Sequence, residues 1–199
     1  MEKNRKEEIL KTAQKLFHEK GYNHVSLRDI ADALHISVGN LTYHYNKKEQ
    51  LIEAIKIKQH PHYAEKPIPT TIYEFYEFLK EVIHNHSEDA YYFRDYGQLA
   101  QICPKVYEIQ VKVIKDMYCF LQKTVENLEK TGDFLDTLTP QQKEGVIHSI
   151  MLFLVYGMPH FERIKPSENI EQVMLSDLYG ILSLCLSEKG KKVFLKGDL

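Results

Sequence analysis

Apolar residues recur at intervals of three and four along most of this chain, which is the spacing of one face of an α-helix. The first predicted helix spans residues 3–20, and its apolar face comprises Ile9, Leu10, Ala13, Leu16 and Phe17. Gly21 provides a C-terminal stop. Tyr22 and Val25 follow in the connection, where we expect them to cover the end of the core.

Three shorter helices are predicted next, over residues 26–34, 38–45 and 47–60. Ser26 begins the first of them, and Asp29 three residues later completes a capping-box pattern. Ser37 is the expected cap of the second helix. The inward apolar positions of the first and third are Leu27, Ile30, Ala31 and Leu34, then Leu51, Ile52 and Ile55.

The remainder of the chain predicts a helical body. Three prolines between residues 60 and 69 interrupt regular structure and indicate a hinge. Five helical stretches follow, at about 70–87, 89–101, 104–131, 140–162 and 168–188, and the last twelve residues resemble a loosely attached tail. The prediction is an all-α chain of about nine helices, with a three-helix head at 1–47 and a body at 48–199 that includes a linking helix at 47–60.

Composition fits a soluble globular protein, with 43% hydrophobic and 27% charged residues. We see neither the apolar core of a secretion signal nor 18 consecutive apolar residues, so we expect a cytoplasmic chain without a membrane partner. The widely spaced cysteines, Cys103, Cys119 and Cys185, indicate buried thiols, since no disulfide or zinc pattern is present.

Charge is divided unevenly along the chain. Residues 1–60 carry 11 Lys and Arg against 8 Asp and Glu, whereas residues 61–199 carry 15 against 20. A basic segment joined to an acidic body is typical of a nucleic-acid-binding head on a second module.

The two short helices at 26–34 and 38–45, joined by a tight turn, form a helix-turn-helix pattern. Ala31 stands where the helices must approach closely, and Ile30, Leu34, Ile36 and Leu41 fill the space between them. The residues left to point outward are Val38, Asn40, Thr42, Tyr43 and His44, a face suited to the major groove of DNA. Lys47 and Lys48 then open the next helix, where ammonium groups can meet phosphate.

This region resembles the TetR family of transcriptional regulators. The residues that carry the resemblance are Gly21-Tyr22, Ser26-Leu27, Ile30-Ala31, Ile36-Ser37, Gly39, Leu41, Tyr43-His44-Tyr45, Lys48-Glu49 and Leu51. The resemblance implies a homodimeric repressor that binds a partly palindromic double-stranded operator and releases it on binding a small-molecule effector.

By matching position, the resemblance assigns base contacts to Ser37, Val38, Asn40, Thr42 and His44, and phosphate contacts to Ser26, Arg28, Tyr43 and Lys48. Two positions depart from the family pattern. His35 occupies the turn where glycine is common, so we expect a left-handed non-glycine residue there. Thr42 stands where the family frequently has tyrosine, so the operator preference of a relative does not carry over to this chain.

The two other classes of function are an enzyme and a structural or adaptor protein. The pairs His60/His62 and His84/His86 have i, i+2 spacing, which does not place two metal ligands on one helical face, and no catalytic motif occurs. We therefore expect neither an enzyme nor a cofactor or metal. A structural or adaptor protein that uses the head for protein contacts remains the alternative.

The body offers two further candidate sites. Aromatic residues suit an effector pocket, with core packing as the alternative reading, and the candidates are Tyr92, Phe93, Tyr96, Tyr118, His148 and Tyr156. The last two long helices carry more apolar positions than one buried stripe needs, which favours a dimer interface. Its candidates are Ile147, Ile150, Met151, Leu154, Leu178, Ile181, Leu182 and Cys185, and a thicker monomer core is the alternative.

Overall fold

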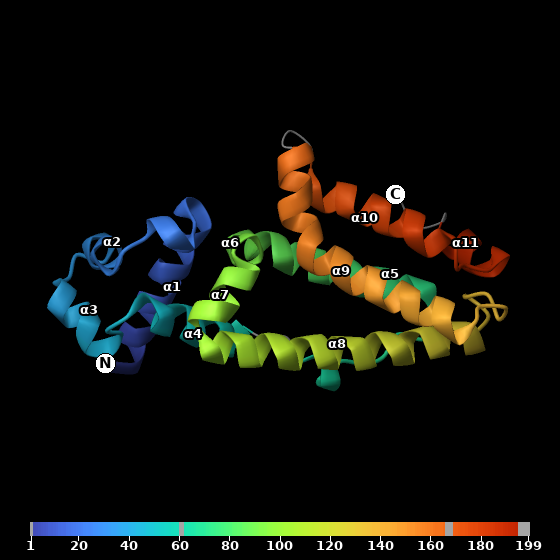
Figure 1. Cartoon of the computed structure of the whole chain (residues 1–199), viewed down its shortest axis with the longest axis horizontal. Coiled ribbons are helices and arrows are strands. Elements are labelled where there is room, and N and C mark those ends of the chain that lie inside the picture. The colour runs from blue at the N-terminus through green and yellow to red at the C-terminus, as the bar shows by residue number, and fades with distance from the viewer. Residues whose placement is uncertain (1, 60–61, 166–168, 195–199) are drawn as a thin grey trace. The chain divides into compact units, whose positions relative to one another are not determined.

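The computed structural model describes residues 2–59, 62–165 and 169–194, and these residues form eleven α-helices, two short 3-10 turns and one isolated bridge between Phe134 and Leu186 (Figure 1). The all-α prediction is therefore confirmed, with two helices more than the nine expected. The chain forms two compact units: Met1–Pro61 with Asp89–Lys112, and His62–Glu88 with Val113–Leu199. The predicted domain boundary at residue 47 lies within the first unit.

The first unit holds the N-terminal helices and a segment from later in the chain. Its elements are α1 (Glu2–Lys20), the turn η1 (Tyr22–His24), α2 (Leu27–Ala33), α3 (Val38–His44), α4 (Lys48–Gln59), α6 (Ala90–Arg94), α7 (Tyr96–Ile102) and the first part of α8 (Pro104–Lys130). The four predicted N-terminal helices are thus confirmed within one or two residues.

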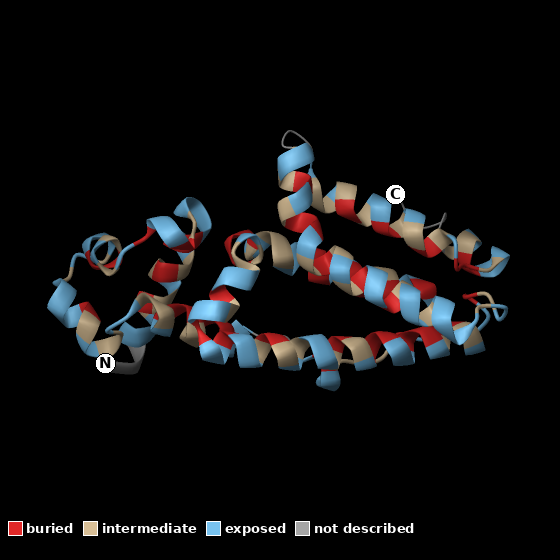
Figure 2. Ribbon diagram, viewed as in Figure 1, coloured by how far each residue is buried: buried red, intermediate tan, exposed pale blue. Residues whose placement is uncertain are grey.

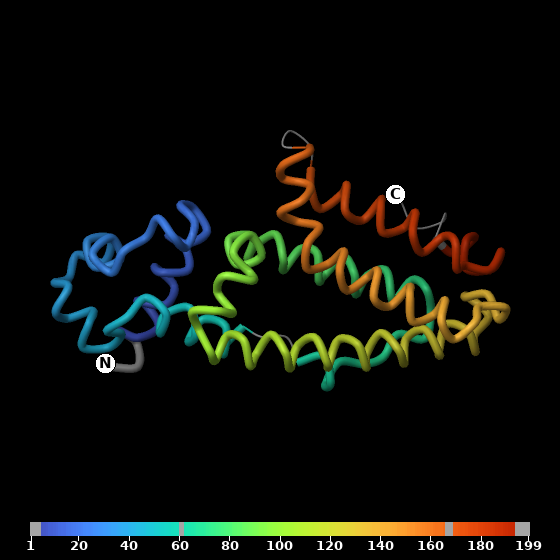
Figure 3. Tube along the Cα trace, in the orientation of Figure 1, coloured from blue at the N-terminus to red at the C-terminus, as the bar shows by residue number. Residues whose placement is uncertain are grey.

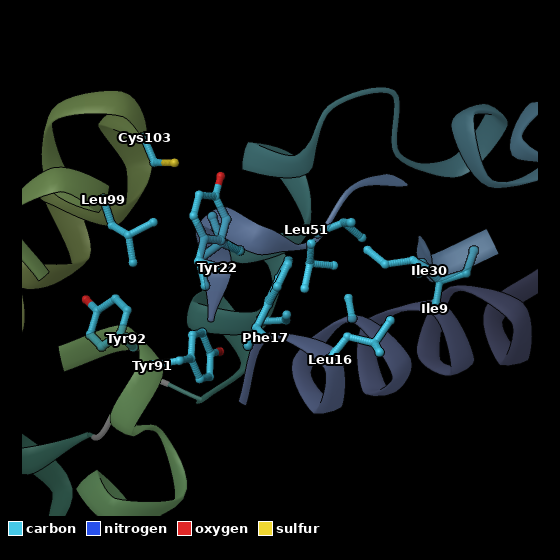
Figure 4. Close-up of a cluster of buried hydrophobic side chains, with 14 of the residues drawn as sticks. Ile9, Leu16, Phe17, Tyr22, Ile30, Leu51, Tyr91, Tyr92, Leu99 and Cys103 are labelled. Carbon is cyan, nitrogen blue, oxygen red and sulfur yellow. The ribbon is translucent and has the colours of Figure 1, made fainter. Parts of the chain in front are cut away.

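One apolar cluster joins these elements (Figure 4). The ring of Phe17 on α1 lies 5.2 Å from that of Tyr22 and 5.8 Å from that of Tyr91 on α6, measured between centroids. Leu99 on α7 is also fully buried in the cluster. Because α6 and α7 contribute buried side chains to the core of α1–α4, they fold with the head.

The second unit comprises η2 (Tyr63–Glu65), α5 (Ile72–Glu88), the rest of α8, α9 (Pro140–Ile164), α10 (Ile170–Ser183) and α11 (Glu188–Phe194). Helix α9 lies against α10 and α5, and α10 and α11 also contact α5, as the trace in Figure 3 allows the reader to follow. Alternation of buried and exposed positions along α8 and α9 gives each an inner face (Figure 2). Within residues 2–59, 62–165 and 169–194, we find no helical stretch whose length and hydropathy would let it span a lipid bilayer.

Three details of the body differ from the sequence prediction. The helix expected at 89–101 is broken at Asp95, whose backbone (φ −107°, ψ 17°) is not helical, and it becomes α6 and α7. The helix expected at 168–188 ends at Ser183. Residues 188–194 of the expected loose tail form α11, while residues 195–199 lie outside the described residues.

The proline-rich segment is in part anchored. Its residues His60 and Pro61 lie outside the described residues, as does the later Pro166. Tyr63 is buried, with its ring 6.0 Å from Phe78 and 6.2 Å from Phe120 between centroids. The expected hinge at 60–69 therefore contains a residue fixed in the core of the second unit.

Candidate nucleic-acid interface

Helix α2 begins with the capping box that the sequence predicts. The Ser26 hydroxyl accepts a hydrogen bond from the Asp29 amide at 3.2 Å, and the Asp29 carboxylate accepts one from the Ser26 amide at 2.7 Å. The hydroxyl also donates to that carboxylate at 2.5 Å. These bonds lower the pKa of Asp29 below its ordinary value. Since its proton is directed to Asp29, Ser26 shapes the start of α2, and its predicted phosphate contact stays a prediction.

The turn between α2 and α3 contains a residue in the left-handed region. His35 has φ of 54°, as expected from its place in the turn. The next residue is bonded back to α2, because the Ile36 amide donates to the Ala31 carbonyl at 3.0 Å. The turn is thus short and hydrogen-bonded, so it sets the direction in which α3 starts.

Helix α3 is fixed to α2 by apolar side chains on its inner face. Leu41 is fully buried, as are Ile30 and Ala31 on α2. Ser37 caps α3 by accepting a hydrogen bond from the Asn40 amide at 3.1 Å. Burial on one side leaves the opposite side of α3 open to solvent, as the helix-turn-helix prediction requires.

The outer face of α3 presents polar and aromatic groups. Tyr43 is 77% exposed and Val38 39% exposed, and the side chains of Ser37 and Asn40 are exposed as well. Thr42 is half-buried, and its hydroxyl donates to the Gly39 carbonyl at 3.2 Å, which leaves its methyl group and oxygen lone pairs for other contacts. These five residues are accessible to solvent on a helix that is fixed by its buried side.

His44 has a different environment from the other α3 candidates. It is half-buried, its Nδ1 has no hydrogen-bond partner among the described residues, and its ring lies edge-on to Tyr43 at 5.0 Å between centroids. This contact positions Tyr43. A base contact by His44 itself stays a prediction.

Of the predicted phosphate-binding cations, Arg28 and Lys47 are exposed, whereas Lys48 is half-buried. The Lys48 Nζ donates to the Tyr22 carbonyl at 2.7 Å and lies 4.2 Å from the centroid of that ring. Burial lowers the pKa of Lys48, against the opposing effect of Glu49 and Asp95. Lys48 therefore ties the start of α4 to η1, a contact across 26 residues of sequence that no local pattern indicates.

The effector-pocket candidates of the first unit form a packed aromatic group. The ring of Tyr92 lies 5.3 Å from Phe93 and 5.5 Å from Tyr96, and Phe93 stacks on Tyr96 at 6.0 Å, all between centroids. The Tyr92 hydroxyl accepts a hydrogen bond from Gln110 Nε2 at 3.0 Å, and burial raises the pKa of Tyr92. These contacts give the three residues a structural role in the core.

The candidates of the second unit are more open. Tyr118 on α8 and His148 on α9 lie with ring centroids 5.7 Å apart, and Tyr156 is 57% exposed. The structure thus pairs two of these residues and leaves the third at the surface. A ligand contact by any of them stays a prediction.

Most candidates for the dimer interface are used within the single chain. Met151 and Ile181 are half-buried, and the other six have at most 6% exposure: Ile147, Ile150, Leu154, Leu178, Leu182 and Cys185. A side chain already buried against its own chain has little surface to offer a partner, so these six belong to the packing of α9, α10 and α5. Among the described residues, the exposed large apolar side chains on or beside α9 and α10 are Leu152, Tyr156, Ile164 and Leu184, and of these only Tyr156 is a candidate from the sequence, for the effector pocket.

Sequence comparison places the similarity in the same N-terminal segment. Residues 9–55 match the family described as bacterial regulatory proteins, tetR family. The chain is 36% identical over 52 residues to the HTH-type transcriptional repressor KstR2 of Mycolicibacterium smegmatis. That alignment covers 26% of this chain and 25% of the relative, so it compares the heads alone.

Structural comparison extends along almost the whole chain. A TetR-family transcriptional regulator from Marinobacter aquaeolei VT8 superposes with a TM-score of 0.85 at 19% identity, covering 96% of this chain and 95% of that one. The ketosteroid transcriptional regulator KstR2 of Mycobacterium tuberculosis superposes with a TM-score of 0.64 at 19% identity, covering 92% and 96%. At these identities the likeness concerns the fold. Residues 9–55 are therefore similar to the tetR family of bacterial regulatory proteins, and the chain as a whole shares the fold of the TetR-family regulator from Marinobacter aquaeolei VT8.

Proposed function

We propose that this chain is a sequence-specific DNA-binding transcription regulator, a repressor that a small molecule releases from its operator. The observation that carries the proposal is the asymmetry of α3. Its inner residue Leu41 is fully buried on α2, while the outer residue Tyr43 is 77% exposed among polar neighbours. A short helix held rigidly by one face and bearing hydrogen-bonding groups on the other is the arrangement with which helix-turn-helix proteins enter the major groove.

Each outer residue of α3 has a chemistry suited to DNA. The exposed amide of Asn40 can bond the N6 and N7 edge of adenine, and the methyl groups of Val38 and Thr42 suit the methyl of thymine. Tyr43 and the cations Arg28 and Lys47 are exposed and would make phosphate contacts, which set affinity without reading sequence. The similarity to KstR2, which is a transcriptional repressor, supports repression rather than activation.

The proposal includes a two-fold dimer. A partly palindromic site requires two recognition helices about 34–36 Å apart, or one turn of B-DNA. The exposed apolar side chains Leu152 and Tyr156 on α9, with Leu184 just after α10, are the surface that a second copy would cover. Replacing Leu152 with glutamate should convert the dimer to monomers, measured by light scattering. A dimer unchanged by that substitution would place the interface elsewhere.

The central test is selection from a pool of randomised DNA duplexes, followed by fluorescence anisotropy of the enriched and a scrambled duplex at two salt concentrations. A sequence-specific regulator binds the enriched duplex more tightly than the scrambled one. Its affinity for DNA falls as the salt concentration rises. Asn40→Ala should relax the base preference, whereas Tyr43→Ala should weaken binding to every duplex alike. Failure of the folded protein to enrich any sequence would favour the adaptor function, in which the head binds a protein.

Release by an effector is tested with the same duplex. Compounds that raise the melting temperature of the purified chain are added to the complex, and the affinity for the enriched duplex is measured again. The coupling equals the ratio of the compound's affinities for free and DNA-bound protein. Equal affinity for DNA with and without every stabilising compound would refute release by small molecules.

A further inference from the structure

The hydroxyl group of Thr42 has a fixed hydrogen-bonding role within α3. It donates its proton to the Gly39 carbonyl at 3.2 Å, one turn earlier on the same helix. The Thr42 side chain is half-buried, so its oxygen still reaches solvent. Because the proton is engaged, only the lone pairs of this oxygen are left for a partner outside the chain.

Ser37, the cap of α3, has the opposite role. Its hydroxyl oxygen accepts a hydrogen bond from the Asn40 amide at 3.1 Å, and its proton is given to no other group among the described residues. The hydroxyl groups of Ser37 and Thr42 therefore differ in what they offer. Ser37 can donate a hydrogen bond to a partner, whereas Thr42 can only accept one.

The backbone beside the Thr42 hydroxyl is open on the outer face of α3. Apart from its chain neighbours and the backbone of its own helix, a Cβ added at Gly39 would meet only Ser37 Oγ, at 3.9 Å. Glycine inside a helix is destabilising relative to alanine, and no packed side chain requires it here. Val38 and Tyr43, next to Gly39 on the helix surface, are exposed. A molecule that approaches this face can thus come close to the Thr42 oxygen.

Each base pair of DNA presents two groups of opposite polarity in the major groove. Adenine N6 and cytosine N4 are amines and donate hydrogen bonds, whereas thymine O4 and guanine O6 are keto oxygens and accept them. An oxygen whose proton is engaged can bond the amine, but it meets a keto oxygen lone pair to lone pair. To bond a keto oxygen, Thr42 would first have to withdraw its proton from the Gly39 carbonyl.

We propose that Thr42 selects an amine over a keto oxygen at one position of the bound DNA, so that adenine and cytosine are preferred there to guanine and thymine. The inference rests on the proposed DNA-binding function and adds the chemistry that one outer residue of α3 recognises. Thr42 stands where the family that this chain resembles frequently has tyrosine, so the preference belongs to this chain. We expect a preference of about three- to tenfold in affinity, which is the contribution of the hydrogen bond that a keto partner would break.

Selection from the randomised pool, repeated with three variants of the full chain, tests the preference. Thr42→Val replaces the hydroxyl with a methyl group of similar size, so the amine preference should disappear at one position and stay unchanged elsewhere. Thr42→Ser keeps a hydroxyl that can make the same bond to the Gly39 carbonyl, and it should retain the preference. Val38→Ala is the control on the same face, because it removes an exposed apolar side chain and should leave that position unchanged.

Removing the amine from the DNA tests the same contact without altering the chain. Purine without the 6-amino group replaces the selected adenine, or the analogue without the 4-amino group replaces the selected cytosine. Anisotropy should show a loss of affinity about three- to tenfold larger for the original protein than for Thr42→Val. Thr42→Val has no acceptor there, so its own loss measures the weaker pairing of the analogue alone. Thr42→Ser should respond as the original protein does.

The possible failures have different signatures. An amine preference that survives Thr42→Val would overturn the inference, as would a guanine or thymine preference that Thr42→Val abolishes, since Thr42 would then act as a donor. Equal weakening of Thr42→Val on every duplex, with a shallower salt dependence, would make phosphate the partner instead. If the original protein enriches no duplex, the proposed function fails and the inference falls with it. If a duplex is enriched but no position depends on Thr42, the inference alone fails.

Discussion

Replacing Lys48 with methionine separates two roles of one side chain. The sequence pattern assigns Lys48 to phosphate, whereas the structure directs its Nζ to the Tyr22 carbonyl at 2.7 Å and over the same ring at 4.2 Å. A hydrogen bond to a charged group contributes about 1.5–3 kcal/mol and a partly desolvated cation–π contact about 0.5–2 kcal/mol. Methionine keeps the aliphatic stem and loses both interactions. The two contributions belong to one side chain and overlap, so their full sum is not expected. We expect a loss of about 2 kcal/mol or more in the free energy of unfolding.

Urea unfolding and DNA anisotropy together make the comparison. A loss of about 2 kcal/mol corresponds to a fall of about 4–8 °C in melting temperature for a chain of this size. Lys47→Met is the matched control, because Lys47 is exposed. It should leave the free energy of unfolding unchanged. It should also reduce the slope of log affinity against log salt concentration by the contribution of about one phosphate contact. The reasoning fails if Lys48→Met is as stable as Lys47→Met. An equal change of salt dependence in the two variants would show that Lys48 also reaches phosphate.

Three further predictions concern stability. His35→Gly should raise the free energy of unfolding by up to about 1 kcal/mol, because φ of 54° strains a side chain and suits glycine; a loss on urea unfolding would contradict this. Gly190→Ala should destabilise by about 1–3 kcal/mol, since its Cβ would clash with the Asp133 carbonyl oxygen. The control Gly180→Ala, which meets nothing within 4 Å, should stabilise by about 0.5–1 kcal/mol, so equal thermal shifts would refute the steric argument. Asp29→Asn should remove a part of the acid sensitivity: the lowered pKa makes the Asp29 contribution present above about pH 4 and lost as pH falls through the folded value, which urea unfolding from pH 6 to 3 measures.

The head could be read from sequence because its signals are local. Ser26 and Asp29 are three residues apart, Ser37 caps the very next helix, and the left-handed turn residue His35 lies between them. The two caps use side-chain to backbone bonds within one helical turn, and the turn residue is identified by its place between the two short helices, so neighbouring residues suffice to predict all three. The outer face of α3 follows from the same reasoning, since a helix with Leu41 buried must expose the residues opposite.

The body was predicted less well because its helix ends depend on distant partners. Residues 188–194 resemble a tail in sequence, yet the Ser187 amide donates to the Asp133 carbonyl at 2.9 Å and the Lys189 Nζ to the Thr131 carbonyl at 2.6 Å. Asp133 in turn accepts a hydrogen bond from the Ile72 amide at 2.9 Å. The turn after α8 thus holds α11 and the start of α5, and no pattern within residues 188–194 indicates that contact.

The apolar excess of α9 and α10 illustrates the same limit at the level of function. Periodicity identified both helices, and six of the eight apolar candidates named for them are buried, but the count of apolar residues does not say against which surface a side chain is buried. Within this chain α9 contacts both α10 and α5, and Ile150 and Leu178 are buried in the single chain. What remains exposed, such as Leu152 and Leu184, is the surface available to a second copy. Sequence periodicity therefore determines which residues avoid water, whereas assigning a partner to them requires the arrangement of the other helices in the fold.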